Sequence, residues 1–172
     1  MIDAVDRKIL RYLQKDARMP NSEIAKRIGM AASAIFERTR KLESKGVIRA
    51  YEARLDANVL DCPLVAFVFV RTSEPAGDKQ TADKLVKIPE VQEVHNVAGE
   101  DCYLLKVRTT DPDQLGKLLR EKIGAVPTVV HTRTTIVMET FKETVHLPFP
   151  EEPDPPKKPK RSSSGRTPAR HG

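Results

Sequence analysis

Residues 21–46 read NSEIAKRIGMAASAIFERTRKLESKG, and this stretch decides the fold of the first part of the chain. Apolar positions recur at helical spacing on both sides of Gly29: Ile24, Ala25 and Ile28 before it, and Ile35, Thr39 and Leu42 after it. Two short helices separated by a glycine are typical of a helix-turn-helix, because glycine ends the first helix in an open or left-handed conformation. The second helix is predicted from about Ala32 to Lys45, before Gly46.

One helix precedes this pair and a short hairpin follows it. Asp3 is a favourable cap for a helix with a single apolar stripe, formed by Val5, Ile9, Tyr12 and Leu13. Residues 47–55 predict a small two-strand wing, although they contain no Asn-Gly or Asp-Gly pair to favour a tight hairpin. We therefore expect a winged helix-turn-helix, with the helical domain at 1–50 and a wing and linker at 51–61.

The second helix of the pair presents groups that recognise DNA on the side opposite its apolar stripe. Hydroxyl, carboxylate and guanidinium side chains bind base edges, and basic side chains bind phosphates. The candidate DNA-binding residues are Ser22, Ser33, Phe36, Glu37, Arg38, Arg40, Lys41 and Arg49. We expect Arg40 to contact bases, and Arg38 and Lys41 to contact phosphates. The pattern alone also fits an ordinary three-helix bundle with a solvated charged face.

Residues 62–145 alternate between strand and helix patterns. Strands are predicted at 64–71, 91–98, 102–109 and 129–140, with helices at about 80–87 and from Asp111 onward. The βαββαβ order predicts an α+β domain with a ferredoxin-like antiparallel sheet and both helices on one face. The first strand is apolar on both sides, so we expect the second face of the sheet to pack on another subunit.

The bulk composition favours an intracellular protein without a membrane segment. No apolar run reaches the roughly 18 residues that span a bilayer, and residues 1–8 do not resemble a signal peptide. The net charge of +6 suggests a nucleic-acid partner, although half of this excess lies in residues 151–172. The proline-rich basic tail, 146–172, is expected to be disordered.

Residues that would support catalysis or metal binding are sparse. His95 and His131 are expected on opposite edges of the sheet, so they cannot share a metal ion within one chain. Cys62 and Cys102 form no CxxC pair, and no nucleophile motif or phosphate-binding glycine loop is present. We expect no catalysis, metal or cofactor. A ferredoxin-like RNA-binding protein is a further alternative, but residues 102–108 lack its stacked aromatic side chains.

Six segments resemble the Lrp/AsnC family, the leucine-responsive and feast/famine regulators of bacteria and archaea. They are DRKIL (6–10), NSEIAKRIG (21–29), RTRKLESKGVI (38–48), IPEV (88–91), GEDCYLLKV (99–107) and TRTTIVM (132–138). The resemblance covers about residues 1–145. It implies a cytoplasmic transcriptional regulator that binds double-stranded DNA and responds to a small effector, expected to be an amino acid. It also implies homodimers that assemble further, into octamers or related discs.

The resemblance also implies an effector site formed between dimers. Its residues would be Gly99, Glu100, Asp101, Cys102 and Tyr103 in one loop, with Thr134, Thr135 and Ile136 from a neighbouring dimer. Glu100 and Asp101 would bind the ammonium group of the ligand. Because Cys102 stands where the family pattern has a second acid, we expect weak binding of ordinary amino acids or a preference for a more apolar ligand. A tight turn without a ligand is the alternative reading of this loop.

Two further departures from the family pattern concern the helix-turn-helix. Ala31-Ala32 stands where Ser-Pro is usual, and Glu37 stands where a basic residue is common. Both affect the expected DNA sequence preference and not DNA binding itself. The alternative function is a ferredoxin-like small-molecule-binding module whose helical half mediates protein contacts.

Overall fold

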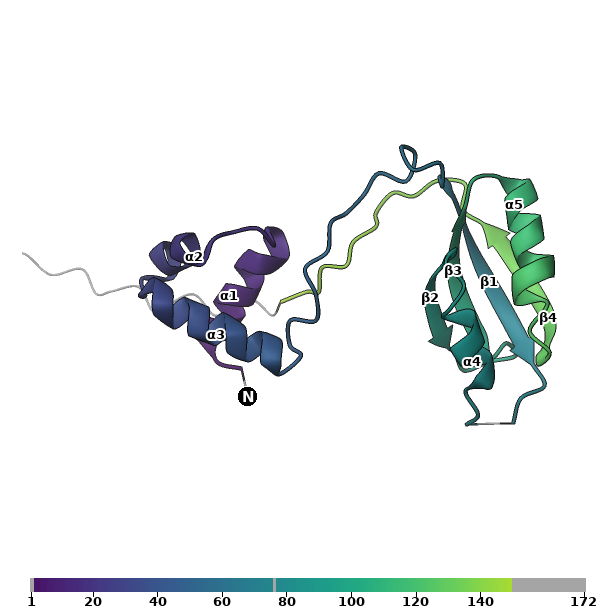
Figure 1. The fold of residues 1–172 in the computed structure, drawn as a ribbon, viewed down its shortest axis with the longest axis horizontal. Coiled ribbons are helices and arrows are strands. Elements are labelled where there is room, and N and C mark those ends of the chain that lie inside the picture. Colours follow the sequence, from purple (N-terminus) through teal and green to yellow (C-terminus); the bar gives the residue numbers. More distant parts are fainter. Residues whose placement is uncertain (1, 76, 150–172) are drawn as a thin grey trace, which may run out of the picture. The chain divides into compact units, whose positions relative to one another are not determined.

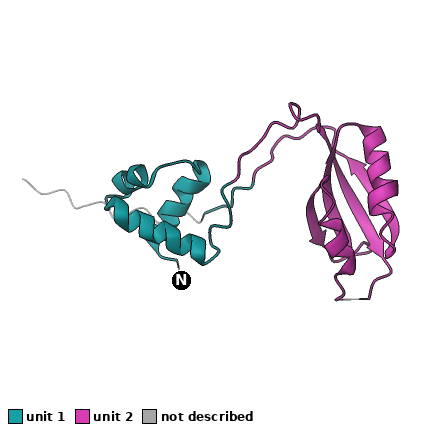
Figure 2. Cartoon of the chain, in the orientation of Figure 1, with its two compact units in different colours: residues 1–51, 145–172 teal, residues 52–144 magenta. Residues whose placement is uncertain are grey.

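The computed structural model describes residues 2–75 and 77–149, which divide into two compact units (Figures 1 and 2). Unit 1 contains the chain up to Tyr51 together with the described residues from Val145 on, and unit 2 contains Glu52–Thr144. No helix among the described residues is long and apolar enough to cross a membrane. The tail predicted to be disordered lies, from residue 150 on, outside the described part of the chain.

Unit 1 is built on three helices, as the apolar spacing predicts: α1 (Ala4–Lys15), α2 (Asn21–Ile28) and α3 (Ala32–Ser44). α1 begins with a capping box, in which Asp3 and Asp6 each accept a hydrogen bond from the other's backbone N–H. α2 ends at Gly29, whose φ of +80° is a conformation that glycine adopts without strain. The stripes of the three helices bury one core: Ile9, Leu13, Ile24, Ala25, Ile35 and Leu42.

The predicted two-strand wing is absent from the described chain. Residues 45–63 contain turns and extended chain but no strand. The segment turns directly under α3, where the backbone N–H groups of Val47 and Ile48 both donate to the carbonyl of Leu42. Without a tight-turn dipeptide, and with no second strand to pair with, residues 47–55 form no ladder.

Unit 1 also includes residues that were predicted to begin the tail. The side-chain amide of Gln14 donates to the carbonyl of Leu147 at 2.8 Å and accepts from its N–H at 3.0 Å. One α1 side chain therefore satisfies both backbone groups of Leu147, as a neighbouring strand would.

Unit 2 has the predicted βαββαβ order. Its elements are β1 (Leu64–Thr72), α4 (Gln80–Leu85), β2 (Val91–Asn96), β3 (Tyr103–Thr109), α5 (Pro112–Lys117), the π-helix η1 (Leu118–Ile123) and β4 (Val129–Ile136). All strand pairs are antiparallel and the strand order is β2-β3-β1-β4, which is the ferredoxin-like order. His95 and His131 lie on β2 and β4, the two edge strands, as expected.

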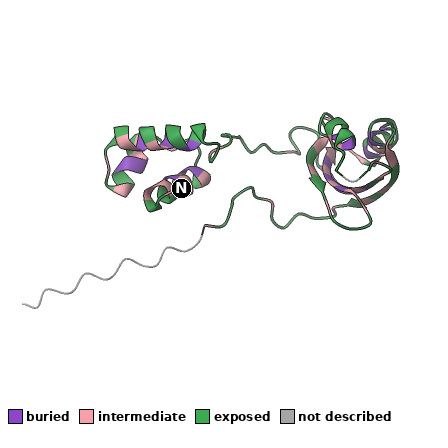
Figure 3. Ribbon diagram, turned by 90° about the horizontal axis from the view of Figure 1, so that it is seen from below, coloured by how far each residue is buried: buried purple, intermediate pink, exposed green. Residues whose placement is uncertain are grey.

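The helices of unit 2 cover only one face of the sheet (Figure 3). Alternate residues of β1 and β3 face them and are buried with the helix side chains: Ala66, Val68, Val70, Leu105, Val107, Leu85, Leu115, Leu118 and Ile123. The intervening residues lie on the second, open face: Val65, Phe67 and Phe69 on β1, and Leu104, Lys106 and Arg108 on β3. The two-sided apolar pattern of β1 therefore has helices packed on one side only.

Part of the open face is covered by the chain that follows β4. The carboxylate of Glu143 pairs with Lys106, with Arg108 at 3.1 Å and with Arg54 at 3.5 Å. The pKa of Glu143 lies below its usual value, mainly because its carboxylate accepts a hydrogen bond from the ammonium group of Lys106. The open face is thus an apolar strip beside a charged network, and its packing on a second subunit stays a prediction.

Candidate DNA-binding and effector-binding sites

The exposed side of α3 carries most of the candidate DNA-binding residues. Ile35, Thr39 and Leu42 are buried, and the remaining positions face solvent, including Ser33, Phe36, Glu37, Arg40 and Lys41. Phe36 is 48% exposed on this side of the helix. Arg40 and Lys41 form no ion pair with any described residue, so their charges are available to a partner.

The remaining candidates flank this helix. Ser22 is exposed in the first turn of α2, and Arg49 is exposed beyond the end of α3. Ala31, the N-cap of α3, makes no side-chain hydrogen bond, so the first N–H groups of α3 receive no protein cap there. Unsatisfied N–H groups at a helix start are good partners for a phosphate oxygen.

Arg38 differs from the other basic residues of α3. Its Nη1 atom lies 2.7 Å from Asp3 Oδ2 and 2.7 Å from Asp6 Oδ1, both at the start of α1. The N–H of Asp6 and the Arg38 guanidinium lower the pKa of Asp3, and the two carboxylates raise that of Arg38. The side chain that was predicted to bind a phosphate is therefore engaged within the protein.

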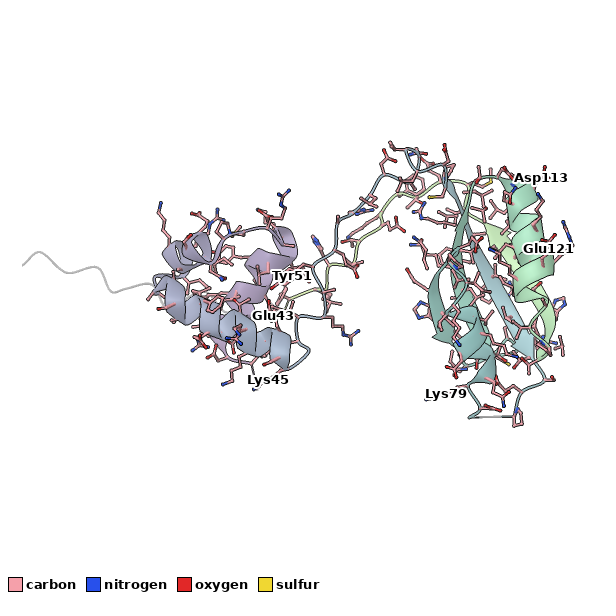
Figure 4. All side chains as sticks on the ribbon, viewed as in Figure 1. Glu43, Lys45, Tyr51, Lys79, Asp113 and Glu121 are labelled. Atoms are coloured by element: carbon pink, nitrogen blue, oxygen red, sulfur yellow. The ribbon has the colours of Figure 1, made fainter. Side chains whose placement is uncertain are left out.

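Tyr51 borders the exposed side of α3 and was not among the residues predicted from the sequence. Its hydroxyl donates to Glu43 on the last turns of α3 at 2.8 Å, and the two side chains lie next to each other in Figure 4. Both line a groove of about 280 Å³ in unit 1 that also includes Phe36, Thr39 and Arg40. The Thr39 Oγ1 atom is buried there without a hydrogen-bond partner among the described residues. The chain after α3 thus borders the surface on which Phe36 and Arg40 lie.

The predicted effector loop lies between β2 and β3, and its two acids are both paired with arginines. Gly99 has a φ of +150°, a backbone conformation that favours glycine. The carboxylate of Glu100 lies 3.5 Å from Arg71, whose Nε also donates to the Glu100 carbonyl. Asp101 is only 12% exposed at its side chain and lies 3.1 Å from Arg133 on β4. A ligand ammonium would have to compete with Arg133 for Asp101.

Tyr103 is buried in the core, and Cys102 is only partly buried. Cys102 packs against the core from the edge, and its N–H donates to the carbonyl of Val70. Tyr103 is buried in the core, where its hydroxyl donates to Glu74 at 3.3 Å. Burial, followed by the charge of Glu74, raises the pKa of Tyr103. The burial of Tyr103 leaves this side chain little access to a ligand, and the role of Cys102 as a ligand contact stays a prediction.

The strand residues of the predicted site lie apart from the loop within one chain. Tyr103 pairs across β1 at Val70, whereas Thr134, Thr135 and Ile136 pair with Val68, Phe67 and Ala66. β3 and β4 lie two strand spacings apart, and the three β4 residues are shifted by two to four residues along the sheet. Together these offsets place Thr134, Thr135 and Ile136 about 12–16 Å from Tyr103. Thr135 and Ile136 are exposed and Thr134 is partly exposed. These residues can complete a site with the loop only if another copy supplies one of the two parts.

Arg133 connects the loop to the open face of the sheet. Its guanidinium lies 3.9 Å from the ring centroid of Phe69 on β1 while it pairs with Asp101. A separate polar hollow of about 710 Å³ in unit 2 is bordered by Arg54, Arg108, Lys142 and Glu143, and by none of the predicted effector residues.

Comparison with known proteins assigns each unit separately. Residues 2–49 match the winged helix-turn-helix DNA-binding family, and residues 65–147 match the Lrp/AsnC ligand binding domain. The leucine-responsive regulatory protein of Escherichia coli K12 is 40% identical over 148 residues, which cover 85% of this chain and 90% of that protein.

Solved structures show the same arrangement of elements. A transcriptional regulator of Neisseria meningitidis in complex with L-methionine has a TM-score of 0.79 at 29% identity, covering 86% of this chain and 97% of the other. The feast or famine regulatory protein of Mycobacterium tuberculosis complexed with L-methionine also has a TM-score of 0.79, at 35% identity, covering 86% and 99%.

A helix-turn-helix with a free basic face, joined to a ferredoxin-like ligand-binding domain, defines a DNA-binding transcriptional regulator. The chain belongs to the Lrp/AsnC family. This assignment favours the DNA-binding function over the alternative in which the helical half mediates protein contacts.

Proposed function

We propose that this regulator reads a DNA site through the exposed face of α3 and binds an amino acid at the Gly99–Tyr103 loop, with a second copy completing the effector site. The observation that carries the DNA part is the free state of Arg40 and Lys41 on a helix whose other side is packed into the core. The proposed interface is completed by the exposed residues around this surface, which are Ser22, Ser33, Phe36, Glu37 and Arg49.

Arg40 and Lys41 have different expected roles. Arg40 lies one helical turn beyond the exposed Phe36, where a recognition helix presents side chains to base edges. Lys41 lies next to it, and its ammonium suits a phosphate oxygen. Loss of a base contact costs about 1–3 kcal/mol and relaxes specificity, whereas loss of a phosphate contact weakens all sequences alike.

The test is binding of Arg40→Ala and Lys41→Ala to a site selected from random DNA, and to random DNA, across a salt series. Arg40→Ala should weaken the selected site by about tenfold or more and leave random DNA nearly unchanged. Lys41→Ala should weaken both and lower the slope of log affinity against log salt by about one. Lys79→Ala, an exposed lysine of unit 2, is the control. Wild-type affinity of both α3 variants for both DNAs would contradict the placement of this face on DNA.

The effector part rests on the loop geometry and on the relatives that hold L-methionine. An amino acid needs an acid for its ammonium, donors for its carboxylate and an apolar wall. Asp101 offers the acid and Arg133 a donor, and Thr134, Thr135 and Ile136 of a second copy offer hydroxyls and an apolar wall. Because Asp101 and Arg133 neutralise each other, a zwitterionic ligand can replace their contact without leaving either charge unpaired.

Thermal shift measurements with the twenty amino acids and their keto acids test this proposal. A ligand at 100 times its Kd stabilises the folded protein by about 2.7 kcal/mol, which raises the Tm measurably. Arg133→Gln should reduce the shift from amino and keto acids alike, since it removes a donor for their carboxylate. Cys102→Asp should increase the shift from ordinary amino acids if the thiol borders the pocket, and Cys62→Asp is the matched control outside the loop. No shift from any compound would reject the effector proposal.

A further inference from the structure

The ion pair of Arg38 joins the recognition helix to the start of the chain. Arg38 Nη1 lies between two carboxylates, at 2.7 Å from Asp3 and 2.7 Å from Asp6. The Arg38 side chain is 34% exposed and that of Asp6 is 15% exposed, so the group is partly shielded from solvent. Arg40 and Lys41, two and three residues further along α3, form no ion pair with a described residue.

Asp3 and Asp6 are held in place by hydrogen bonds that do not involve Arg38. Each accepts the backbone N–H of the other in the capping box, at 2.8 and 3.1 Å. Acids at the start of a helix are also stabilised by the helix dipole. The two carboxylates therefore present a fixed acceptor for one guanidinium, and a charge-assisted bond to a fixed acceptor constrains the donor more than one to a mobile surface acid.

The position of Arg38 on α3 makes this constraint relevant to DNA. Consecutive helical residues are 100° apart around the axis, so Arg38 lies between the buried stripe of Thr39 and Ile35 and the exposed Glu37. Fixing one side chain at the margin of the buried stripe fixes the rotation of the helix about its axis. At a side-chain reach of about 7 Å, a rotation of 20° moves the tip of Arg40 by about 2.4 Å, which is enough to break a hydrogen bond to a base edge.

We propose that Arg38 is a positioning residue: its clamp on Asp3 and Asp6 sets the rotation of α3, and it stays on the protein when DNA is bound. This replaces the phosphate contact that the sequence predicts for it. The two paired carboxylates disfavour a second anion beside Arg38, and only its Nε and Nη2 groups would remain to bind a phosphate. The proposal depends on DNA binding by α3 but not on the effector.

Replacement of Asp6 by asparagine distinguishes two effects of this acid on DNA binding: holding Arg38 in place, and repelling the DNA phosphates by its charge. Asparagine keeps the side-chain oxygen that caps α1, so Asp6→Asn and Asp3→Asn remove charge from the clamp and preserve the capping bonds. Removing an acid from a DNA-binding unit strengthens binding to phosphates by ordinary charge effects. If Asp6 acts by holding Arg38, Asp6→Asn should instead weaken the selected site by about tenfold while random DNA is bound as well as before or better.

The experiment compares Arg38→Gln, Arg38→Lys, Asp3→Asn and Asp6→Asn on selected and random DNA across a salt series, below the Tm of each variant. Arg7→Gln and Asp16→Asn are the controls, since both are exposed residues on or next to α1 and lie outside the clamp. Arg38→Gln should lose affinity for the selected site, keep the wild-type salt slope, and be partly rescued by lysine. Circular dichroism melts check that each variant is folded at the temperature of the assay.

Three results would overturn the proposal. A loss by Arg38→Gln that is equal on both DNAs, with a salt slope lower by about one, identifies a phosphate contact. Stronger binding of Asp6→Asn to the selected site means that the acids only restrain a DNA-binding arginine. Wild-type behaviour of all four variants means that the clamp does not influence the helix. In each case Arg40→Ala still reports whether α3 binds DNA at all.

Discussion

Tyr51 shows how one side chain reports on the surface beside the recognition helix. Burial, followed by its hydrogen bond to Glu43 and the charge of that acid, raises the pKa of Tyr51 to about 12. The neutral hydroxyl is therefore favoured by folding. Its stabilising contribution is complete below the unfolded pKa of 10.0 and is lost as the pH rises through the folded pKa.

An ultraviolet titration of the tyrosines measures this pKa directly. The wild type should show a component with a midpoint near 12. That component should disappear in Tyr51→Phe and persist in Tyr12→Phe. Loss of the partly exposed hydrogen bond should lower the free energy of unfolding of unit 1 by at most about 1 kcal/mol at neutral pH. If Tyr51→Phe leaves the titration above pH 11 unchanged, the contact with Glu43 does not form in solution.

For individual residues, the sequence predicts which side chains are exposed better than it predicts which side chains they contact. The helical period alone places Ser33, Phe36 and Arg40 on the outside of α3, because each lies about 90° or more from the middle of the stripe formed by the buried residues. It cannot show that Arg38 reaches Asp3, 35 positions earlier, or that Arg133 reaches Asp101. Such pairs follow from the packing of elements that are distant in the sequence.

The second helical segment of unit 2 changes its hydrogen-bond pattern along its length. α5 continues into the π-helix η1, and the N–H of Gly124 donates to the carbonyl of Leu119 at 2.8 Å. A Cβ atom added at Gly124 would lie 2.8 Å from that carbonyl oxygen and 3.2 Å from the one of Arg120. At Gly116, in α5, the nearest atom would be the flexible end of the Arg120 side chain.

Alanine at these two glycines should have opposite effects. Gly124→Ala forces backbone atoms apart and should destabilise unit 2 by about 1–3 kcal/mol. Gly116→Ala should stabilise it by about 0.5–1 kcal/mol, because alanine has the higher helix propensity and the arginine can move. Urea unfolding followed by far-ultraviolet circular dichroism measures both values. Equal effects of the two substitutions would show that the π-turn does not close on Gly124.

The elements themselves are largely predictable, and the exception is instructive. The helix caps at Asp3 and Asp111, and the glycine at 29, act locally, so the sequence places those helix boundaries within a residue or two. β1 follows from its continuous apolar run, and β4 from its β-branched residues. The wing at 47–55 was wrongly predicted, because two short strands need a specific turn or a third partner strand, and the described chain supplies neither.

For the whole molecule, the open face of the sheet is the surface on which we expect assembly. Phe67 lies on that face between Lys106 and Thr135, whereas Val68 is fully buried under the helices. We expect the open faces of two copies to pack together, burying Phe67, Phe69 and Leu104, which are only partly buried within one chain. Higher assemblies would then be built from these dimers.

Light scattering at micromolar concentration tests this assembly. The wild type should be a dimer or larger, and Phe67→Asp should be a folded monomer, because a charge at the centre of an apolar interface is costly to bury. Val68→Asp should instead prevent folding of unit 2, since it introduces the same charge into the core. A monomeric wild type, or a Phe67→Asp variant that assembles normally, would place the interface elsewhere.

The central position of β1 also matters while the chain is being made. β1 ends at Thr72 and its second neighbour, β4, ends at Ile136, so 64 further residues must be synthesised before both neighbours exist. At roughly 5–20 residues per second this takes about 3–13 s. During that interval the nascent chain carries the unpaired apolar segment LVAFVFV. Its neighbours Pro63 and Arg71 are of the residue types that discourage pairing with other chains. The yield of soluble protein in a cell should therefore depend on how well this short segment is shielded in those seconds.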